Sequence, residues 1–199
     1  MPYLRQEFKA NPLSYFSHLI GHEGENSLLS YLKAEDYAMD LCAGGDHELD
    51  CLSDFTITIT LTKKGLANTD KVIDATFKYI QRLKEVGPQE WVFEETKKVG
   101  TISFDFAEKG DPMGYAVGLA RTMPHFGTSD SMQHLLRHKY LADEYKPEIL
   151  TDIINVLAEP QRCLVLLSSK SFPTETLPIH EKWYKFDYSL EKLSEERLG

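Results

Sequence analysis

The sequence predicts an α+β fold in which a mixed or antiparallel β-sheet packs against several α-helices. Two strands are expected early, at residues 37–43 and 54–62, and two late, at residues 163–169 and 182–188, with a helical middle. This order differs from the regular strand–helix alternation of parallel α/β folds. Four strands are few for so many helices, and the first helix opens close to Met1, so we expect an N-terminal strand to be missing.

The clearest strand is the segment from Asp54 to Thr62. Apolar and polar residues alternate along it, the apolar ones being Phe55, Ile57, Ile59 and Leu61 and the polar ones Thr56, Thr58, Thr60 and Thr62. A period of two places one kind of side chain on each face of a sheet. The apolar run 163–167 has the length of a buried strand.

Helices are expected wherever apolar residues recur at helical spacing. Asn11 and Pro12 supply an N-cap and a first-turn proline for the first helix, which Gly21 and Gly24 end. Asn26 or Ser27 caps the next one. Further helices are predicted at residues 66–86, 89–107, 112–122, 129–140 and 147–157.

Composition excludes several functional classes. Asp plus Glu number 31 and Lys plus Arg 22, which gives a net charge of −9 and argues against binding to nucleic acid or to an anionic membrane surface. No apolar run approaches the roughly 18 residues that span a bilayer, and the N-terminus lacks a signal-peptide core. The three cysteines (Cys42, Cys51 and Cys163) have no metal-binding spacing and indicate buried thiols in a reducing compartment. We therefore expect a cytoplasmic protein.

Motifs for chemistry are scarce. The pairs His18/His22 and His134/His138 have the i, i+4 spacing that places two imidazoles on one helix face, as zinc requires. Neither pair has the glutamate of H-E-x-x-H or H-x-x-E-H, and neither has an evident third ligand. Solvated or capping histidines are the simpler interpretation, and an independent zinc hydrolase built on either pair is an alternative.

Several segments carry a resemblance to a known family. Residues 11–33 (NPLSYFSHLIGHEGENSLLSYLK) are similar to the NPxxYxxHLIGHEGxGSLLSxLK segment of the insulinase (pitrilysin) family of inverted-motif zinc metalloendopeptidases. Further similar segments follow in the family's order, at residues 61–66, 77–83, 87–95, 144–149, 168–172 and 182–184. The resemblance covers essentially the whole chain.

The resemblance implies a non-catalytic role. It matches residues 1–199 to the second of the family's four homologous domains, as a single domain truncated at its N-terminus. The family's zinc ligands, H-x-x-E-H plus a distal Glu, lie in the first domain, so zinc belongs to the parent family and no cofactor is expected here. In relatives the second domain holds the N-terminus of a peptide substrate at an exosite, where the peptide adds as a strand to a sheet edge.

The residues expected to bind substrate come from two segments. The HLIGHEG segment supplies His18, Gly21 and Glu23, and the strand that reads LVGGQ in a relative supplies Leu41, Cys42, Ala43, Gly44 and Gly45. Glu23 is a suitable partner for an ammonium group, because charge-assisted hydrogen bonds are strong; its simpler role is a solvated acid at a helix end. Ala43 adds a Cβ where the relative has glycine, and Gly45 removes an amide side chain.

Two functions follow from the resemblance. In the first, the chain anchors peptides that have a free N-terminus, and cleavage requires the catalytic domain of the parent peptidase. In the second, it is a stand-alone peptide-binding or regulatory module without protease activity. Faces normally covered by neighbouring domains would be exposed in either case, so self-association is expected.

Overall fold

The computed structural model describes residues 1, 3–46 and 51–193. The helices are α1 (Pro12–Ile20), α2 (Leu28–Ala34), α3 (Lys63–Leu66), α4 (Thr69–Val86), α5 (Glu90–Asp105), α6 (Pro112–Thr122), α7 (Ser129–Met132) and α8 (Pro147–Leu157). The strands are β1 (Ala38–Asp46), β2 (Asp54–Leu61), β3 (Ile179–His180) and β4 (Asp187–Tyr188). Short 3-10 turns lie at residues 5–7, 123–125, 160–162 and 174–176. The fold is α+β, as predicted.

The central feature is the antiparallel pair of β1 and β2. The register places Leu41 opposite Ile59 and Ala43 opposite Ile57 on one face, with Cys42 opposite Thr58 on the other. Along β2 the threonines are exposed and the apolar residues half-buried, so the alternation in the sequence divides the strand into a core face and an outer face.

The apolar face of this pair packs on two clusters of buried side chains. The first cluster joins α1, α4, α5 and α8 through Phe16, Ile20, Ile80, Val92 and Ile153, among others. The second joins α2, β1 and α4 and includes Leu28, Leu29, Leu32, Leu41 and Val72. Ala43, Ile57 and Tyr79 contact both clusters, so the strands and helices share one continuous core.

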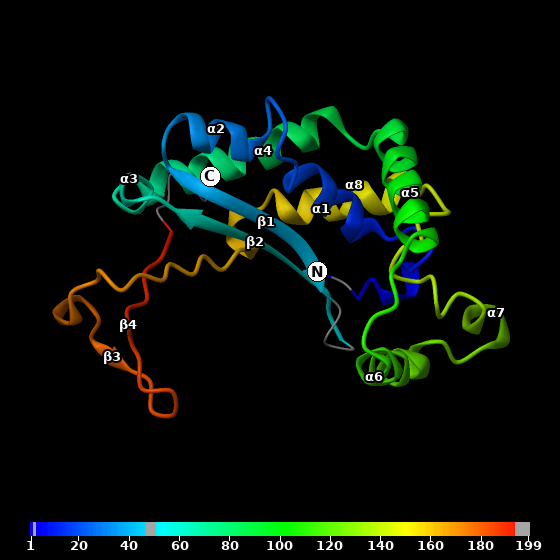
Figure 1. Cartoon of the computed structure of the whole chain (residues 1–199). Helices are drawn as coiled ribbons and strands as arrows, with labels where there is room; N and C mark the ends of the chain where they lie inside the picture. Colours follow the sequence, from blue (N-terminus) through cyan, green and yellow to red (C-terminus); the bar gives the residue numbers. More distant parts are fainter. Residues whose placement is uncertain (2, 47–50, 194–199) are drawn as a thin grey trace.

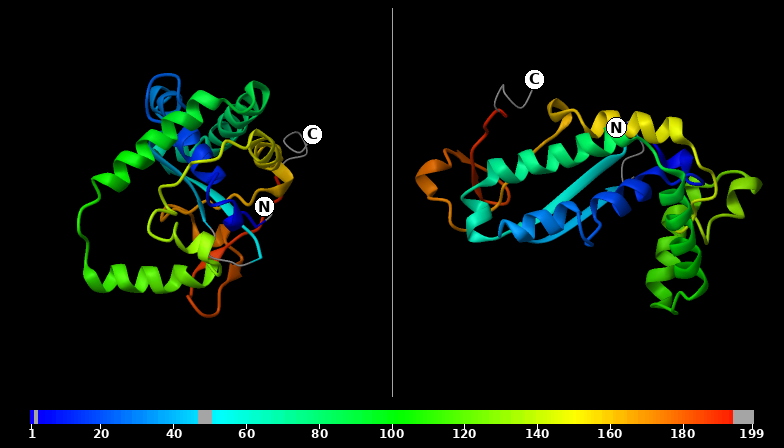
Figure 2. Two further views of the ribbon diagram at one scale, coloured as in Figure 1. Left: turned by 90° about the vertical axis from the view of Figure 1, so that its right-hand side faces the viewer. Right: turned by 90° about the horizontal axis from the view of Figure 1, so that it is seen from above.

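The views show how these elements are arranged. Helices α1, α2, α4 and α8 gather along the long β1–β2 pair, while α5 leads away from them to α6 (Figure 1). The two turned views show the same projection of α5 and α6 from the main body (Figure 2). The segment that carries β3 and β4 extends away on the opposite side (Figure 1). No described helix combines the length and apolar character needed to cross a bilayer.

Three predicted elements differ from the structure. Residues 163–169 form no strand, and Leu164 and Leu166 are 89% and 87% exposed. The expected helix at 129–140 is limited to α7, whose single turn begins at a capping box between Thr128 and Ser131. Turns follow it up to Tyr140. The predicted last strand at 182–188 shrinks to β4, which pairs with β3 in a two-residue ladder.

Candidate functional site

The last turn of α1 is held by three hydrogen bonds. The Ser17 hydroxyl donates to the Leu13 carbonyl at 2.8 Å, and the Gly21 amide donates to the Ser17 carbonyl at 2.9 Å. The Tyr79 hydroxyl of α4 donates to the Leu19 carbonyl at 3.1 Å, and burial raises the pKa of this phenol. These bonds fix the position at which the chain leaves α1 and enters residues 22–24, called the HEG segment below.

Gly21 lies directly against β1. A Cβ added at Gly21 would stand 3.8 Å from both the Cβ and the backbone nitrogen of Ala43, and only 2.7 Å from the Ser17 carbonyl oxygen. A side chain therefore does not fit at this position without movement of the helix end. The structure thus brings together the two segments that the resemblance assigns to one site.

The outer edge of β1 is open along the candidate residues. No backbone hydrogen bond joins residues 41–45 to any described residue outside β2. Leu41 is buried on the core face, and Cys42 is exposed on the outer face. A Cβ at Gly44 would meet nothing within 4 Å, but one at Gly45 would fall 2.4 Å from the Leu13 side chain. Gly45 therefore lets α1 pack against the end of the strand.

The charged residues of the site lie at its rim. Glu23 is exposed, and no hydrogen bond or ion pair joins it to another described residue. His18 is half-buried, with its Nε2 3.8 Å from the Glu95 carboxylate of α5. The His22 ring, whose centroid is 6.3 Å from that of His18, folds over Gly24. This arrangement leaves the Glu23 carboxylate accessible to a cationic group.

The expected metal-site alternatives gain no support within residues 1, 3–46 and 51–193, where no cluster of three potential ligands occurs. His138 packs on Phe126 and its Nδ1 lies 2.7 Å from the Leu135 carbonyl. Burial, followed by the charges of Lys139 and Arg5, lowers the pKa of His138 against the opposing effect of the Leu135 carbonyl. His134 packs on Phe8. Both rings thus serve packing.

The expectation of buried thiols was wrong, because Cys42, Cys51 and Cys163 are all exposed. Cys42 occupies an outward position of β1, as the period of two requires. Cys163 lies in the segment 163–169, which has no strand partner to cover it.

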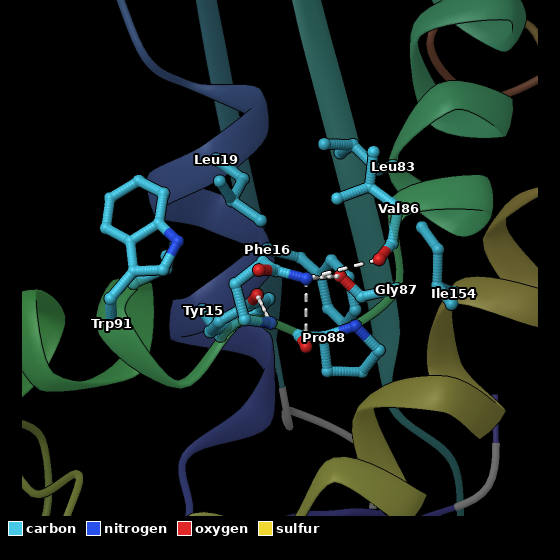
Figure 3. A pocket seen from close by; sticks show the side chains of 11 residues that line it. Tyr15, Phe16, Leu19, Leu83, Val86, Gly87, Pro88, Trp91 and Ile154 are labelled. Carbon is cyan, nitrogen blue, oxygen red and sulfur yellow. Dashed lines mark hydrogen bonds between the residues drawn. The ribbon is translucent and has the colours of Figure 1, made fainter.

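An apolar hollow of about 190 Å³ opens beside α1, where α4 turns into α5. Its walls are formed by Tyr15, Phe16, Leu19, Leu83, Val86, Gly87, Pro88, Gln89, Trp91, Val92 and Ile154. Trp91 lies on one side and Leu83, Val86 and Ile154 on the other (Figure 3). The sequence patterns did not predict this hollow; the available signal was a tryptophan three residues after the proline of the Gly87-Pro88 helix break.

Hydrogen bonds hold the turn at residues 87–89, which lies between α4 and α5 and lines the hollow. Gly87 has φ +72°, which favours glycine. The Gln89 side-chain amide donates to the carbonyls of Val86, Gly87 and Pro88 at 3.1–3.3 Å. The Gln89 backbone amide donates to the Tyr15 hydroxyl at 2.9 Å, and burial raises the pKa of Tyr15 despite this bond.

Comparisons with known proteins place this geometry in a family. Residues 1–99 match the family model described as "Peptidase M16 inactive domain", and residues 104–199 match "Middle or third domain of peptidase_M16". The chain is 35% identical over 189 residues to insulin-degrading enzyme of Homo sapiens, which covers 95% of this chain and 18% of that protein. It is 34% identical over 197 residues to nardilysin of Rattus norvegicus, covering 97% of this chain and 16% of nardilysin.

A solved structure agrees with these sequence matches. The crystal structure of pitrilysin superposes with a TM-score of 0.87 at 25% identity, over 100% of this chain and 20% of that one. The chain therefore belongs to the insulinase family of M16 peptidases. It corresponds to the inactive and middle-domain part of such enzymes and spans less than a fifth of the length of human insulin-degrading enzyme. The interpretation of residues 1–199 as a single domain stays a prediction.

Proposed function

We propose that this chain anchors the N-terminal residues of peptide substrates for a zinc metalloendopeptidase of the insulin-degrading enzyme or nardilysin type, without cleaving them. The observation that carries the proposal is the contact between Gly21 and Ala43, which brings the end of α1 against an open strand edge. We assign zinc to the proposed parent enzyme, because the H-x-x-E-H motif of the family does not occur in this sequence. No step is therefore assigned to a metal in this chain.

Binding would proceed by strand addition. An extended peptide can use the unpaired N–H and C=O groups of residues 41–45, because half the backbone groups of an edge strand point away from its partner. Main-chain bonds of this kind accept varied sequences. The added strand would lie edge to edge with β1, and its side chains would alternate between the outer face, beside Cys42 and Gly44, and the core face, beside Leu41 and Ala43.

The α-amino group of the peptide would be held at the HEG segment. Glu23 offers an exposed carboxylate two residues after the glycine that touches β1, and hydrogen bonds to a charged partner are stronger than neutral ones. His18, His22 and Glu95 form the neighbouring wall. A cytoplasmic location and a contact with the parent's catalytic domain remain predictions that accompany this proposal.

Calorimetric titration with a decapeptide, as the free amine and as its N-acetylated form, tests the proposal. We expect acetylation to weaken binding roughly tenfold or more, because a charged hydrogen bond contributes about 1.5–3 kcal/mol. Equal affinity of the two forms would remove the amine-capture role.

Two variants test whether the Glu23 carboxylate itself binds the amino group. Glu23→Gln should lower affinity for the free amine and leave the acetylated peptide unaffected, whereas Glu25→Gln in the same exposed loop should change neither. A chelator should not alter affinity, and the purified chain should leave the decapeptide intact. Hydrolysis that disappears on substitution of His18 or His138 would contradict the proposal.

A further inference from the structure

The hollow at the α4–α5 turn has the features of a binding pocket for one large side chain. Its volume of about 190 Å³ suits a phenyl or isobutyl group, since an engineered apolar cavity of about 150 Å³ takes up benzene. Apolar and aromatic side chains form almost all of its wall. The polar atoms present, those of Tyr15 and Gln89, are bonded to the turn itself.

Trp91 stands at the mouth of the pocket. It is 67% exposed, and Val86 on the opposite wall is 49% exposed. Tryptophans beside apolar pockets are typical of binding hot spots. The bonded Gly87–Gln89 turn keeps the pocket open without a ligand, which lowers the entropic cost of binding.

Charge around the pocket points to the chemistry of the occupant. Glu94 and Glu95 follow Trp91 by three and four residues on α5, so they lie on the same side of the helix one turn further on, and Glu90 precedes it. All three carboxylates are exposed. Arg82 on α4 is already paired with Glu85 at 3.2 Å, so those two charges cancel. Lys84 lies on α4, but the lysines of α5 begin only at Lys97, so the charges on α5 nearest Trp91 are carboxylates.

We propose that this pocket binds a peptide segment that inserts one leucine- or phenylalanine-sized side chain beside Trp91 and places a lysine or arginine against Glu94. The site is separate from the edge of β1 and does not require a free N-terminus. Leu19 lines the pocket, and its neighbour His18 belongs to the anchoring site, so one extended peptide can reach both sites over the end of α1.

The test uses the full chain and an N-acetylated peptide, acetyl-Lys-Ala-Phe-Ala-Lys-amide, which has no free α-amino group, and a Glu23→Gln variant shows that its lysine side chains do not bind there. Tryptophan emission reports on the site directly in a Trp183→Phe background, because the chain has only two tryptophans. We expect saturable quenching or a blue shift with this peptide and none with the peptide in which alanine replaces phenylalanine. Glutamates in place of its lysines should weaken binding several-fold.

Variants locate the effect by calorimetry. Trp91→Ala should weaken binding about tenfold or more, as loss of a hot-spot tryptophan does. The control is Trp183→Ala, which changes a tryptophan that is 77% exposed and does not line the pocket, and it should have no effect. Glu94→Gln should reduce affinity a few-fold and Glu108→Gln should not. Because Trp91 is exposed, its removal leaves the core intact, and a far-ultraviolet spectrum identical to that of the parent chain confirms this.

Three outcomes would overturn the proposal. The first is equal affinity for the phenylalanine and alanine peptides, and the second is equal loss in the two tryptophan variants. The third is a dimer seen by sedimentation that Trp91→Ala abolishes while the peptide fails to bind, which would make a second copy of the chain the occupant. None of these outcomes bears on amine capture at Glu23, because every peptide in the series is acetylated.

Discussion

Leucines in the N-terminal and C-terminal regions of the chain differ in their exposure to solvent. Leu29 and Leu32 of α2 are 1% and 0% exposed, whereas Leu164 and Leu166 are 89% and 87% exposed. The first pair faces β1 and α4 across a shared cluster. Among the described residues after Ile154, none is buried. Similar apolar content thus gives a core in one region and an uncovered surface in the other, because burial depends on a partner element at the correct distance.

The contrast should be largest in amide hydrogen exchange. The hydrogen-bonded amides of α1 and α2 and those that β1 directs to β2 open only through loss of the core, whereas residues 163–193 have few backbone bonds to protect them. We expect the two groups to differ in exchange rate by at least about a thousandfold, given ordinary domain stability. Mass spectrometry of exchanged peptides measures this difference. Comparable protection in both regions would show that the C-terminal segment finds a partner in solution.

A pair of leucine substitutions tests the same contrast energetically. Leu32→Ala removes a fully buried side chain and should lower the free energy of unfolding by about 2–5 kcal/mol. Leu166→Ala makes the same chemical change at an exposed position and should stay within about 0.5 kcal/mol. Urea denaturation gives both values. A large loss from the second variant would mean that residue 166 is covered, by self-association or otherwise.

Hydrogen bonding by tyrosine offers a finer comparison. Tyr15→Phe removes the acceptor of the Gln89 amide and should cost about 1–3 kcal/mol by leaving a partly buried donor unpaired. Tyr184→Phe changes a residue that is 85% exposed and should have almost no effect. The melting temperatures of the two variants, measured side by side, give this comparison. If both variants melt alike, then the bond does not hold the α4–α5 turn.

The smallest expected effect is a pH dependence at His138. Burial lowers the pKa of this imidazole below its usual value of 6.5, so the folded state favours the neutral ring. Its contribution to stability is therefore complete above about pH 6.5 and is lost as the pH falls through the lower folded-state pKa. Chemical denaturation between about pH 7.5 and 5.5 should show this loss, and His138→Gln should flatten it. If the free energy of unfolding of the variant depends on pH as steeply as that of the parent chain, the loss of stability comes from groups other than His138.

Local patterns in the sequence were sufficient for the elements of the core. The Thr/apolar alternation of residues 54–62 predicted β2 and its two faces, and the first-turn proline Pro12 predicted the start of α1. The expectation that Asn11 caps this helix was wrong, because Asn11 has φ +42° and its side chain makes no cap bond. The proline at the first position of α6 and the Asp111 cap, whose carboxylate accepts a bond from the Gly114 amide, likewise predicted that helix. In each case the decisive interaction lies within a few residues along the chain.

Elements that depend on distant partners could not be predicted in this way. The run 163–167 has strand propensity, but propensity does not supply a neighbouring strand, and the segment is extended and exposed. The helix expected at 129–140 ends after one turn. His138 packs on Phe126 instead, and its Nδ1 lies 2.7 Å from the Leu135 carbonyl. The candidate site shows the same division, because only the structure places Gly21 against Ala43.

Helix α1 meets β1 through glycine at both ends, with Leu13 beneath Gly45 and Gly21 beside Ala43. At these two points one partner is glycine, which has no side chain to change its rotamer. Moving α1 away from β1 would also break the bond that Tyr79 makes to the Leu19 carbonyl. The strand edge at which a peptide would add therefore rests on a helix that is tied to α4, and selection among ligands would fall to the side chains that project beyond that edge.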